Sequence, residues 1–370
     1  MKLDDILIAA HKIGASDIHL KIFKEPVVRK NRKLQILEGF GKLDKDLLEE
    51  YIKQVVPSEQ KRKLLEENGE IDISYSIHKV SRYRVNIYKQ RGTYAFAFRA
   101  LKTEVPNIDE LMLPKKLYDI ALEPRGLILV TGPTGSGKST TLASMIDYRN
   151  SKERDVIITI EDPIEYLFSD KNCYIVQREV SLDTKEFSTA LKAALREDPD
   201  VIMVGEMRDI ETIEIALRSA ETGHLVFSTL HTNDAKETIN RIIDVFPLEA
   251  QRHIRLLLAS TLSAVISQRL IPRKDGNGIV PAVEILINTA AVQDAIMDVD
   301  KFSTIYDLME KGTKQYGMQT FDQSILNLYN EGYISYEDAV SNASNPSDLI
   351  LKIKGISSGE IGEDFFNFGG

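Results

Sequence analysis

The segment Gly132–Thr140, with the letters GPTGSGKST, places the tightest constraint on how this chain can fold. It has the spacing of a phosphate-binding P-loop and lies between an apolar run, GLILVT, and a run of helical character, TTLASMI. Its small residues let backbone N–H groups converge on phosphate oxygens, and the start of the following helix adds partial positive charge. The candidate nucleotide-contacting residues are Gly132, Pro133, Thr134, Gly135, Ser136, Gly137, Lys138, Ser139 and Thr140. We expect ATP to bind here, with Lys138 on the β- and γ-phosphates and Ser139 on Mg²⁺.

Apolar strands surround this loop in the sequence. The runs GLILVT, DVIITIE, DVIMVGE and HLVFSTL are each followed by a loop or a helical segment. Continuous apolar strands are buried on both faces, which is typical of a parallel sheet between two layers of helices. The predicted fold class of this region is therefore α/β, with further helices between about residue 290 and residue 354.

The first hundred residues have a different pattern. Helical spacing is present in 3–13, in 47–55 and after Pro57, and strands are predicted at 71–77, 82–89 and 93–101. We predict a small α+β domain over 1–101, a linker over 102–112, an ATPase domain with C-terminal helices over 113–354 and a flexible tail over 355–370. The linker assignment rests on weak periodicity and Pro106, and the tail is rich in glycine and acidic residues.

Charge and cysteine content exclude several classes of protein. The chain has 47 Lys and Arg against 56 Asp and Glu, a formal net charge of −9, which disfavours sequence-general binding to nucleic acid. Cys173 is its one cysteine, so neither an internal disulfide nor a multi-cysteine zinc site can form. No apolar run approaches the roughly 18 to 20 residues of a membrane helix, and the N-terminus does not resemble a signal peptide. We expect a cytoplasmic protein.

Acidic residues follow two of the apolar strands. DVIMVGE ends in Glu206, and DVIITIE ends at Glu161 and Asp162. Because the carboxyl ends of parallel strands lie at one edge of the sheet, these groups are expected near the nucleotide. We predict that Glu206 polarises the attacking water, whereas Glu161 and Asp162 contact Mg²⁺ through water or position the same nucleophile. The alternative for this pair is a helix entry at which Asp162 acts as a cap.

Two histidines flank the strand HLVFSTL. His231 follows its carboxyl end, on the nucleotide side, where an imidazole can sense the γ-phosphate. His224 precedes the strand and is therefore expected at the opposite end, against a neighbouring element or subunit. A structural role is the alternative for each.

Arginines share one predicted strand face in the first domain. Tyr83, Val85 and Ile87 alternate with Arg82 and Arg84. Pairing with the next strand adds Arg99 to the same face. Such a cationic cluster is expected to meet a phosphate supplied by another domain, in the manner of an arginine finger, with a solvated strand face as the alternative.

Together these motifs resemble the hexameric ATPases of the secretion superfamily, specifically the PilT/PilU family of type IV pilus retraction ATPases. The resemblance is carried by the P-loop and by GASDIHL, TIEDPIEY, VIMVGE, ETGHLVFSTLHTNDA and YGMQTFDQSILNLYNEGYISYEDA, which together span nearly the whole chain except its tail. It implies a PAS-like N-terminal domain, a RecA-like ATPase domain and a homohexamer. In that ring each nucleotide-binding site is completed by residues of a neighbouring subunit. It assigns catalytic roles to Glu206, Glu161, Asp162, His224, His231, Arg82, Arg84 and Arg99. The implied activity is ATP hydrolysis to ADP and phosphate, coupled to pilus disassembly and twitching motility.

The resemblance also implies partners and a sub-class. The partners are an inner-membrane pilus platform protein and, for an accessory member, a paralogous retraction ATPase; nucleic acid is not among them. Assembly ATPases usually carry a four-cysteine zinc module, which this chain lacks. PilT-type members carry the helix sequence AIRNLIRE, but here Gln293 and Met297 stand at its arginine positions. A PilU-like role is therefore favoured, and a slow, nucleotide-gated accessory subunit is the alternative to an autonomous motor.

Overall fold

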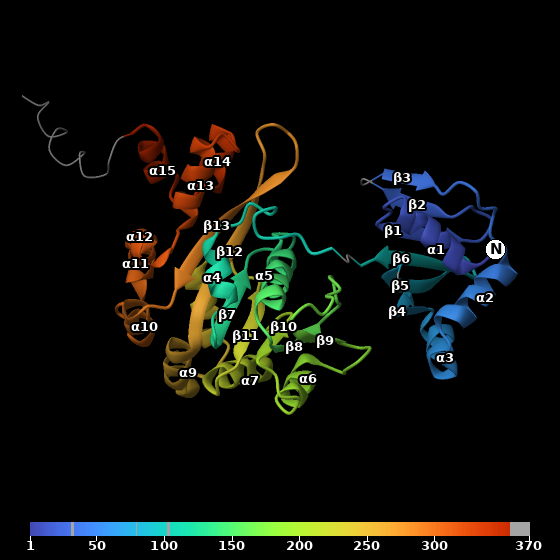
Figure 1. The fold of residues 1–370 in the computed structure, drawn as a ribbon, viewed down its shortest axis with the longest axis horizontal. Coiled ribbons are helices and arrows are strands. Elements are labelled where there is room, and N and C mark those ends of the chain that lie inside the picture. Colours follow the sequence, from blue (N-terminus) through green and yellow to red (C-terminus); the bar gives the residue numbers. More distant parts are fainter. Residues whose placement is uncertain (31–32, 79, 102–103, 356–370) are drawn as a thin grey trace, which may run out of the picture. The chain divides into compact units, whose positions relative to one another are not determined.

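The computed structural model describes residues 1–370 except 31–32, 79, 102–103 and 356–370. It divides into two compact units, 1–104 with 164–167 and 105–163 with 168–370, which are drawn in Figure 1. The expected tail lies outside the described residues apart from Gly355. Within the expected linker, residues 102 and 103 are also outside them, whereas Ile108 is fully buried in a core of the second unit. Part of that segment is therefore packed rather than loose.

The first unit is an antiparallel sheet with helices on one face. Its strands are β1 (Asp17–Lys21), β2 (Val27–Lys30), β3 (Lys33–Ile36), β4 (Glu70–Ile77), β5 (Ser81–Gln90) and β6 (Thr93–Ala100), in the order β3-β2-β1-β6-β5-β4. Helices α1 (Leu3–Lys12), α2 (Lys45–Val55) and α3 (Glu59–Asn68) contribute to the core beneath it. The predicted alternation in β5 is confirmed, because Tyr83, Val85 and Ile87 are fully buried. Strands β1 to β3 were not predicted, because they are short and of mixed polarity.

The second unit contains a seven-stranded sheet. Its strands are β7 (Gly126–Thr131), β8 (Val156–Glu161), β9 (Tyr174–Glu179), β10 (Val201–Val204), β11 (Leu225–Leu230), β12 (Leu262–Pro272) and β13 (Ile279–Ile287), in the order β13-β12-β7-β11-β10-β8-β9. The predicted parallel pairing of the four apolar strands is confirmed, whereas β13, which the sequence did not predict, pairs with β12 in antiparallel register. The cause is the short connection 273–278, which permits a hairpin but no crossover. The remaining pairs are parallel.

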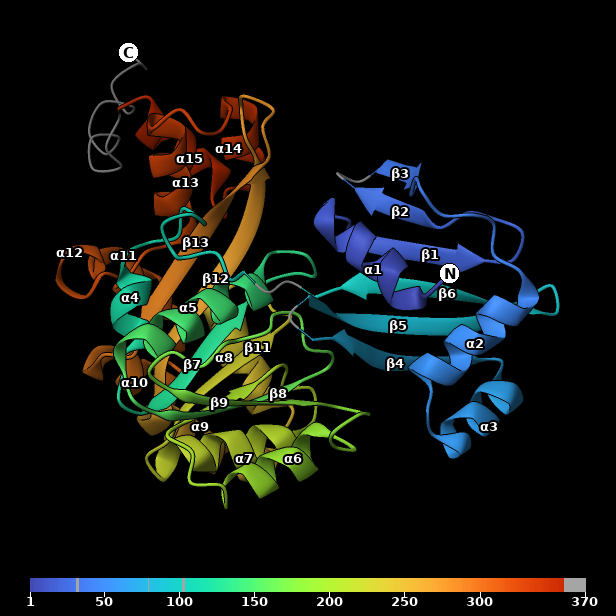
Figure 2. The same cartoon turned by 45° about the vertical axis from the view of Figure 1, so that its right-hand side comes forward.

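Helices cover both faces of this sheet, as Figure 2 shows. In β7, Leu127 and Leu129 belong to one core, whereas Ile128 and Val130 belong to the other. The first core is shared with α6 (Phe187–Ala194), α7 (Ile210–Glu221), α8 (Ala235–Asp244), α9 (Leu248–Thr261), α10 (Ala290–Met297) and α11 (Ile305–Lys311), which follows the 3₁₀ turn η1 (Phe302–Thr304). The second is shared with α4 (Lys116–Ala121) and α5 (Lys138–Lys152). The predicted α/β class is therefore confirmed.

The last helices of the chain are α12 (Thr313–Tyr316), α13 (Phe321–Asn330), α14 (Tyr336–Asn342) and α15 (Pro346–Ile353). Of these, α13 and α14 contact the projecting hairpin of β12 and β13 (Figure 1). A separate small core joins Ile271 and Val280 of the hairpin to Phe321 and Ile325 of α13.

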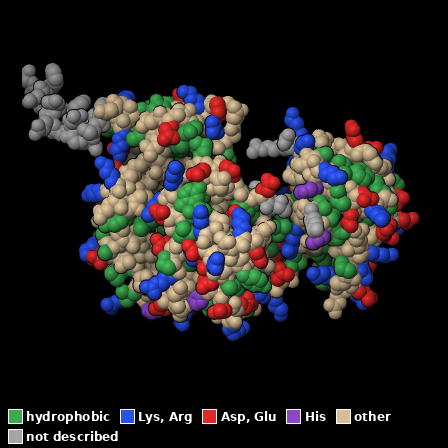
Figure 3. All heavy atoms as spheres, in the orientation of Figure 1, with side chains coloured by type: hydrophobic (Ala, Val, Ile, Leu, Met, Phe, Trp, Pro, Cys, Tyr) green, Lys and Arg blue, Asp and Glu red, His purple; other side chains and the backbone are tan. Residues whose placement is uncertain are grey.

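The surface of the protein carries charges of both signs. Basic and acidic side chains are interspersed on the face shown in Figure 3. Among the described residues, no helix combines the length and apolar character needed to cross a membrane.

Candidate nucleotide-binding site

The P-loop joins the end of β7 to the start of α5. Gly132 and Gly137 have φ angles of 144° and 91°, in the region that favours glycine. A Cβ atom on Gly132 would lie 2.4 Å from the carbonyl oxygen of Gln268, so a side chain at this position would force the backbone apart. The predicted strand–loop–helix geometry is thereby confirmed.

Lys138 and His231 connect this loop to the end of the neighbouring strand. The buried Lys138 Nζ donates to the carbonyl oxygens of Gly132 at 2.8 Å and Pro133 at 3.1 Å. It also lies 3.4 Å from His231 Nδ1, while His231 Nε2 lies 3.3 Å from Glu206 Oε1. Because a lysine ammonium only donates, Nδ1 must accept here, and Nε2 then carries the proton that faces the carboxylate. The imidazole thus bridges the P-loop lysine and the carboxylate after β10.

Glu206 has a second partner, which the sequence did not indicate. Arg208 Nη2 lies 2.8 Å from Glu206 Oε2. Burial opposes ionisation of Glu206, but the hydrogen bonds from Arg208 and His231 and the positive charge of Arg208 outweigh it and lower the pKa of this carboxyl. All three side chains line a cavity of about 370 Å³. Glu206 is therefore a carboxylate at neutral pH, held at both oxygens.

The acidic pair after β8 is divided between two environments. Glu161 is buried, and its Oε1 accepts from Thr159 Oγ1 at 2.7 Å and Gln177 Nε2 at 3.1 Å. Asp162 is exposed, and its charge raises the pKa of Arg208, after the larger effect of Glu206. Asp162 is the cap of no described helix, so the helix-entry alternative is not the arrangement found.

Gln268 on β12 braces the P-loop from the side. Its Nε2 donates to the Ser136 carbonyl oxygen at 2.8 Å, and its Oε1 accepts from Thr141 Oγ1 at 2.9 Å. The side chain is buried. Gln268 was not predicted from the sequence, since it lies in no motif and follows the P-loop by more than a hundred positions.

An apolar cavity adjoins the same part of the P-loop. Its volume is about 350 Å³, and Gly137, Thr140 and Thr141 form one side. Leu113, Leu270, Ile279 and Pro281 are among the residues that form the others. Apolar walls beside a phosphate loop suit a flat nucleobase. The signal that could have found this cavity is the apolar character of residues 111–113 and 279–281.

Comparison with known proteins shows the family to which this chain belongs. The model for "Type II/IV secretion system protein" matches residues 2–278, which is most of the chain. The chain belongs to this family. PilT of Pseudomonas aeruginosa, a type IV pilus retraction ATPase, is 44% identical over 349 residues, which cover 94% of this chain and 100% of that protein. PilU of the same organism is 44% identical over 299 residues, 81% of this chain and 78% of that protein.

Solved structures agree with this assignment. The crystal structure of the pilus retraction motor PilT with bound ADP matches with a TM-score of 0.85 at 48% identity, covering 94% of this chain and 98% of that one. The ATPase DotB of Legionella pneumophila matches with a TM-score of 0.77 at 27% identity and 96% coverage of both chains. The predicted membership of the PilT/PilU family is confirmed, and with it the N-terminal domain followed by an ATPase domain and C-terminal helices.

In this PilT/PilU-family chain, His224 lies apart from the phosphate loop. It precedes β11, and its Nδ1 lies 2.9 Å from the Ser219 carbonyl oxygen near the end of α7. His231 and His224 are therefore at opposite ends of one strand, as the sequence predicts. Within one chain, only His231 of the pair contacts the residues around the P-loop.

The predicted arginine face is present in the first unit. Arg84 stands directly opposite Arg99 across β5 and β6, and Arg82 lies two residues further along β5 on the same face. Arg99 Nε donates to Asp17 at 2.9 Å, and Arg84 Nε lies 3.9 Å from Asp72 Oδ1. Arg84 and Arg99 therefore have acidic partners in their own unit. No pattern in the sequence indicated those partners.

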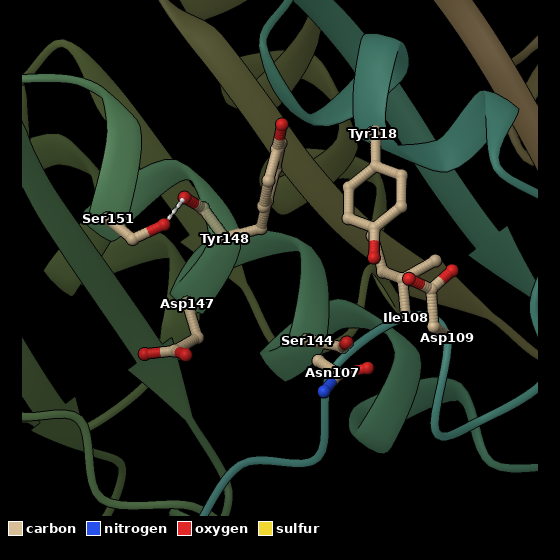
Figure 4. Close-up of a pocket in the computed structure, with 8 residues that line it drawn as sticks. All are labelled: Asn107, Ile108, Asp109, Tyr118, Ser144, Asp147, Tyr148 and Ser151. Atoms are coloured by element: carbon tan, nitrogen blue, oxygen red, sulfur yellow. Dashed lines mark hydrogen bonds between the residues drawn. The ribbon is translucent and has the colours of Figure 1, made fainter.

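A further cavity lies away from the phosphate loop (Figure 4). It has a volume of about 450 Å³ and is lined by α4, α5 and residues 107–109. Tyr118 and Tyr148 form an aromatic wall with ring centroids 4.5 Å apart. None of the predicted site residues lines it.

The position of Gln268 leads to a prediction for nucleotide affinity. In Gln268→Ala the Ser136 carbonyl and the Thr141 hydroxyl lose a buried partner. We expect the P-loop to loosen and nucleotide affinity to fall about tenfold. Titration with a fluorescent ADP analogue measures this effect. Gln293→Ala, on the half-exposed part of α10, is the matched control, and equal affinities for the two variants would contradict the bracing role.

Proposed function

We propose that this chain is an Mg²⁺-dependent ATPase whose hydrolysis of ATP to ADP and phosphate powers type IV pilus retraction. Its membership of the PilT/PilU family supports the activity. The observation that carries the chemical assignment is the line of contacts from Lys138 through His231 to Glu206, which joins a phosphate-binding group to a water-orienting carboxylate.

Each of these residues has a distinct role in the proposed reaction. Lys138 exchanges its carbonyl partners for oxygens of the β- and γ-phosphates. Glu206 orients the attacking water as a hydrogen-bond acceptor, which its ionised state allows. His231 contacts both groups, so a change at the phosphates that moves Lys138 also changes the environment of Glu206. We assign His231 the role of sensor on that basis.

Oxygen donors near the P-loop fit Mg²⁺. The Ser139 hydroxyl lies in the first turn of α5, and the carboxylates of Glu161 and Asp162 follow a strand of the same sheet. Hydroxyl and carboxylate oxygens are ligands that Mg²⁺ prefers, directly or through water. Ser139 would hold the ion, which when bound neutralises charge on the β- and γ-phosphates. Glu161 and Asp162 would orient its water ligands.

A ring of six subunits is the proposed working state. The arginine face of the first unit supports this, because Lys21 and four arginines, at positions 29, 82, 84 and 99, share it with only three acidic residues, Asp17, Glu70 and Asp72. We propose that this face, with His224, completes the nucleotide site of a neighbouring subunit. The ring would act in the cytoplasm on an inner-membrane pilus platform protein.

Arg84 gives the proposed ring a direct test. Arg84→Ala is expected to leave nucleotide binding by separate subunits unchanged. At ring-forming concentrations kcat should fall about tenfold, less than for a lone arginine finger because Arg82 and Arg99 remain. Steady-state ATPase assays over a range of protein concentrations measure this. Arg91→Ala, in the exposed turn after β5, is the control, and an equal kcat for both variants at every concentration would remove Arg84 from the site.

An accessory role is the second candidate, favoured by α10. Gln293 and Met297 stand on this helix where PilT-type members carry arginines, and the Met297 side chain is exposed. PilT and PilU are equally similar to this chain in percentage identity. The deciding experiment is the steady-state ATPase rate of the purified chain alone and mixed with a PilT paralogue from the same source. Robust activity alone indicates an autonomous motor, whereas weak activity that rises on mixing indicates an accessory subunit.

A further inference from the structure

Glu284 is a buried acidic residue outside every motif of the sequence analysis. It lies on β13 with 3% of its surface exposed. Its Oε1 accepts a 2.8 Å hydrogen bond from the backbone N–H of Ala235, the first residue of α8. The backbone N–H of Phe321, the first residue of α13, also faces this carboxylate and lowers its pKa. One side chain therefore accepts a hydrogen bond from the N-terminus of α8 and lies near that of α13, where negative charge is most favourable.

A buried chain of hydroxyl groups extends from this position to the P-loop. Ser267 on β12 pairs with Glu284 in the strand register, and Thr131 Oγ1 donates to Ser267 Oγ at 3.0 Å. Thr238 Oγ1 on α8 lies 3.4 Å from Thr131 Oγ1 and 2.6 Å from Thr232 Oγ1. All of these residues are buried. Thr131 immediately precedes the P-loop, and Thr232 immediately follows His231, so the chain joins the two segments beneath the nucleotide site.

We propose that Glu284 is a positioning residue for ATP hydrolysis: its carboxylate holds the start of α8, and so keeps the preceding segment 231–234 in the place that puts His231 between Lys138 and Glu206. The same carboxylate ties this segment to α13 and thus to the C-terminal helices. This inference rests on the proposed roles of His231 and Glu206.

The ionisation of Glu284 makes this role testable. Burial raises the pKa of Glu284 to about 7, against the opposing hydrogen bond from Ala235. The charged groups that act on it are Asp234 before α8, which raises its pKa, and Arg269 on β12, which lowers it. On α13, the neighbouring Asp322 is engaged elsewhere, by the backbone N–H groups of Ser344 and Asn345. Glu284 therefore exchanges its proton near neutral pH, and only the ionised form offers both helices a charged acceptor.

The first test compares Glu284→Gln with the wild type in steady-state ATPase assays from about pH 6 to about pH 8.5. Glutamine keeps the shape and one acceptor oxygen but cannot ionise. We expect kcat of the variant to be about fivefold lower at the alkaline end and equal at the acid end. His231 is present in both proteins, so the difference between the two profiles reports Glu284. Superimposable profiles would overturn the proposal.

The second test separates positioning from packing. Because the folded-state pKa is raised, the wild type should lose stability as pH rises from about 4.5 towards 7, and Glu284→Gln should not. At the alkaline end the urea concentration that unfolds half of the variant should therefore be at least that of the wild type, although the kcat of the variant is lower. A joint loss of kcat and urea resistance would indicate a packing role and overturn the proposal.

Amide hydrogen exchange supplies a readout that does not depend on activity. In full-length Glu284→Gln, exchange at the starts of α8 and α13 should accelerate together, and unchanged exchange at both would overturn the contact. Asp322→Asn is the matched control, since it removes a buried carboxylate that accepts from the N–H groups of Ser344 and Asn345 and from the Tyr306 hydroxyl, none of which belongs to α8. It should keep the wild-type pH profile. If Glu206→Gln hydrolyses ATP normally, the proposed catalytic assignment fails, yet the exchange result still decides the role of Glu284 in holding the two helices.

Discussion

Glu206→Gln is expected to bind ATP as the wild type does and to hydrolyse it about a thousandfold more slowly. The amide oxygen of glutamine can still accept from Arg208 or from His231, whereas its NH₂ group replaces the other acceptor, so the end of β10 should keep one of its two contacts. What the variant loses is the negative charge that orients and polarises water. Arg208 and His231 lower the pKa of Glu206, after burial has opposed them, so this charge is present throughout the neutral range. The defect should therefore not be relieved by raising the pH.

Single-turnover ATPase measurements and titration with a fluorescent ATP analogue separate the two effects. Glu237→Gln is the matched control, because Glu237 lines the same cavity but accepts the Asn233 N–H through Oε2. It should retain wild-type turnover to within about twofold. Normal hydrolysis by Glu206→Gln would remove this residue from the chemical step. Loss of affinity together with turnover would indicate a structural role.

The parts of the site that the sequence predicts are those encoded by neighbouring residues. The P-loop needs glycine at fixed offsets between a strand and a helix, and both Gly132 and Gly137 adopt positive φ. Glu206 and His231 follow buried apolar strands, and adjacent parallel strands bring their carboxyl ends to one edge. Period-two alternation likewise predicted the buried face of β5 and the opposite arginine face.

The remaining features depend on which strands become neighbours, and no local pattern specifies that. Gln268 reaches the P-loop because β12 lies beside β7. Glu284 reaches α8 because β13 returns antiparallel to β12 and forms an edge that was not predicted from the sequence. The acidic partner of Arg99 comes from β1, a strand too short and polar to be predicted. These are consequences of long-range register, which a single sequence leaves undetermined.

Lys138→Ala is expected to weaken nucleotide binding by about two hundredfold, close to 3 kcal/mol. The side chain is buried, and its ammonium group is aimed at the carbonyl oxygens of Gly132 and Pro133 within the loop. Alanine leaves the φ angles of the glycines unaffected, so the loop can still form. The phosphates, however, lose the one side-chain cation of the P-loop. Backbone N–H groups and the start of α5 alone should give the weak residual affinity.

Isothermal titration with ADP and with ATP measures this loss of affinity. The difference between the two nucleotides shows which phosphate Lys138 contacts. A lysine that reaches the γ-phosphate should cost ATP more affinity than ADP when it is removed. Lys152→Ala is the control on the same helix, since Lys152 lies near the Tyr148 ring in the last turn of α5. Its affinity for both nucleotides should equal that of the wild type. Wild-type affinity in Lys138→Ala would mean that the loop GPTGSGKST binds phosphate through its backbone alone. Lys138 would then not connect His231 to the nucleotide, and the proposed role of His231 as a sensor would fail.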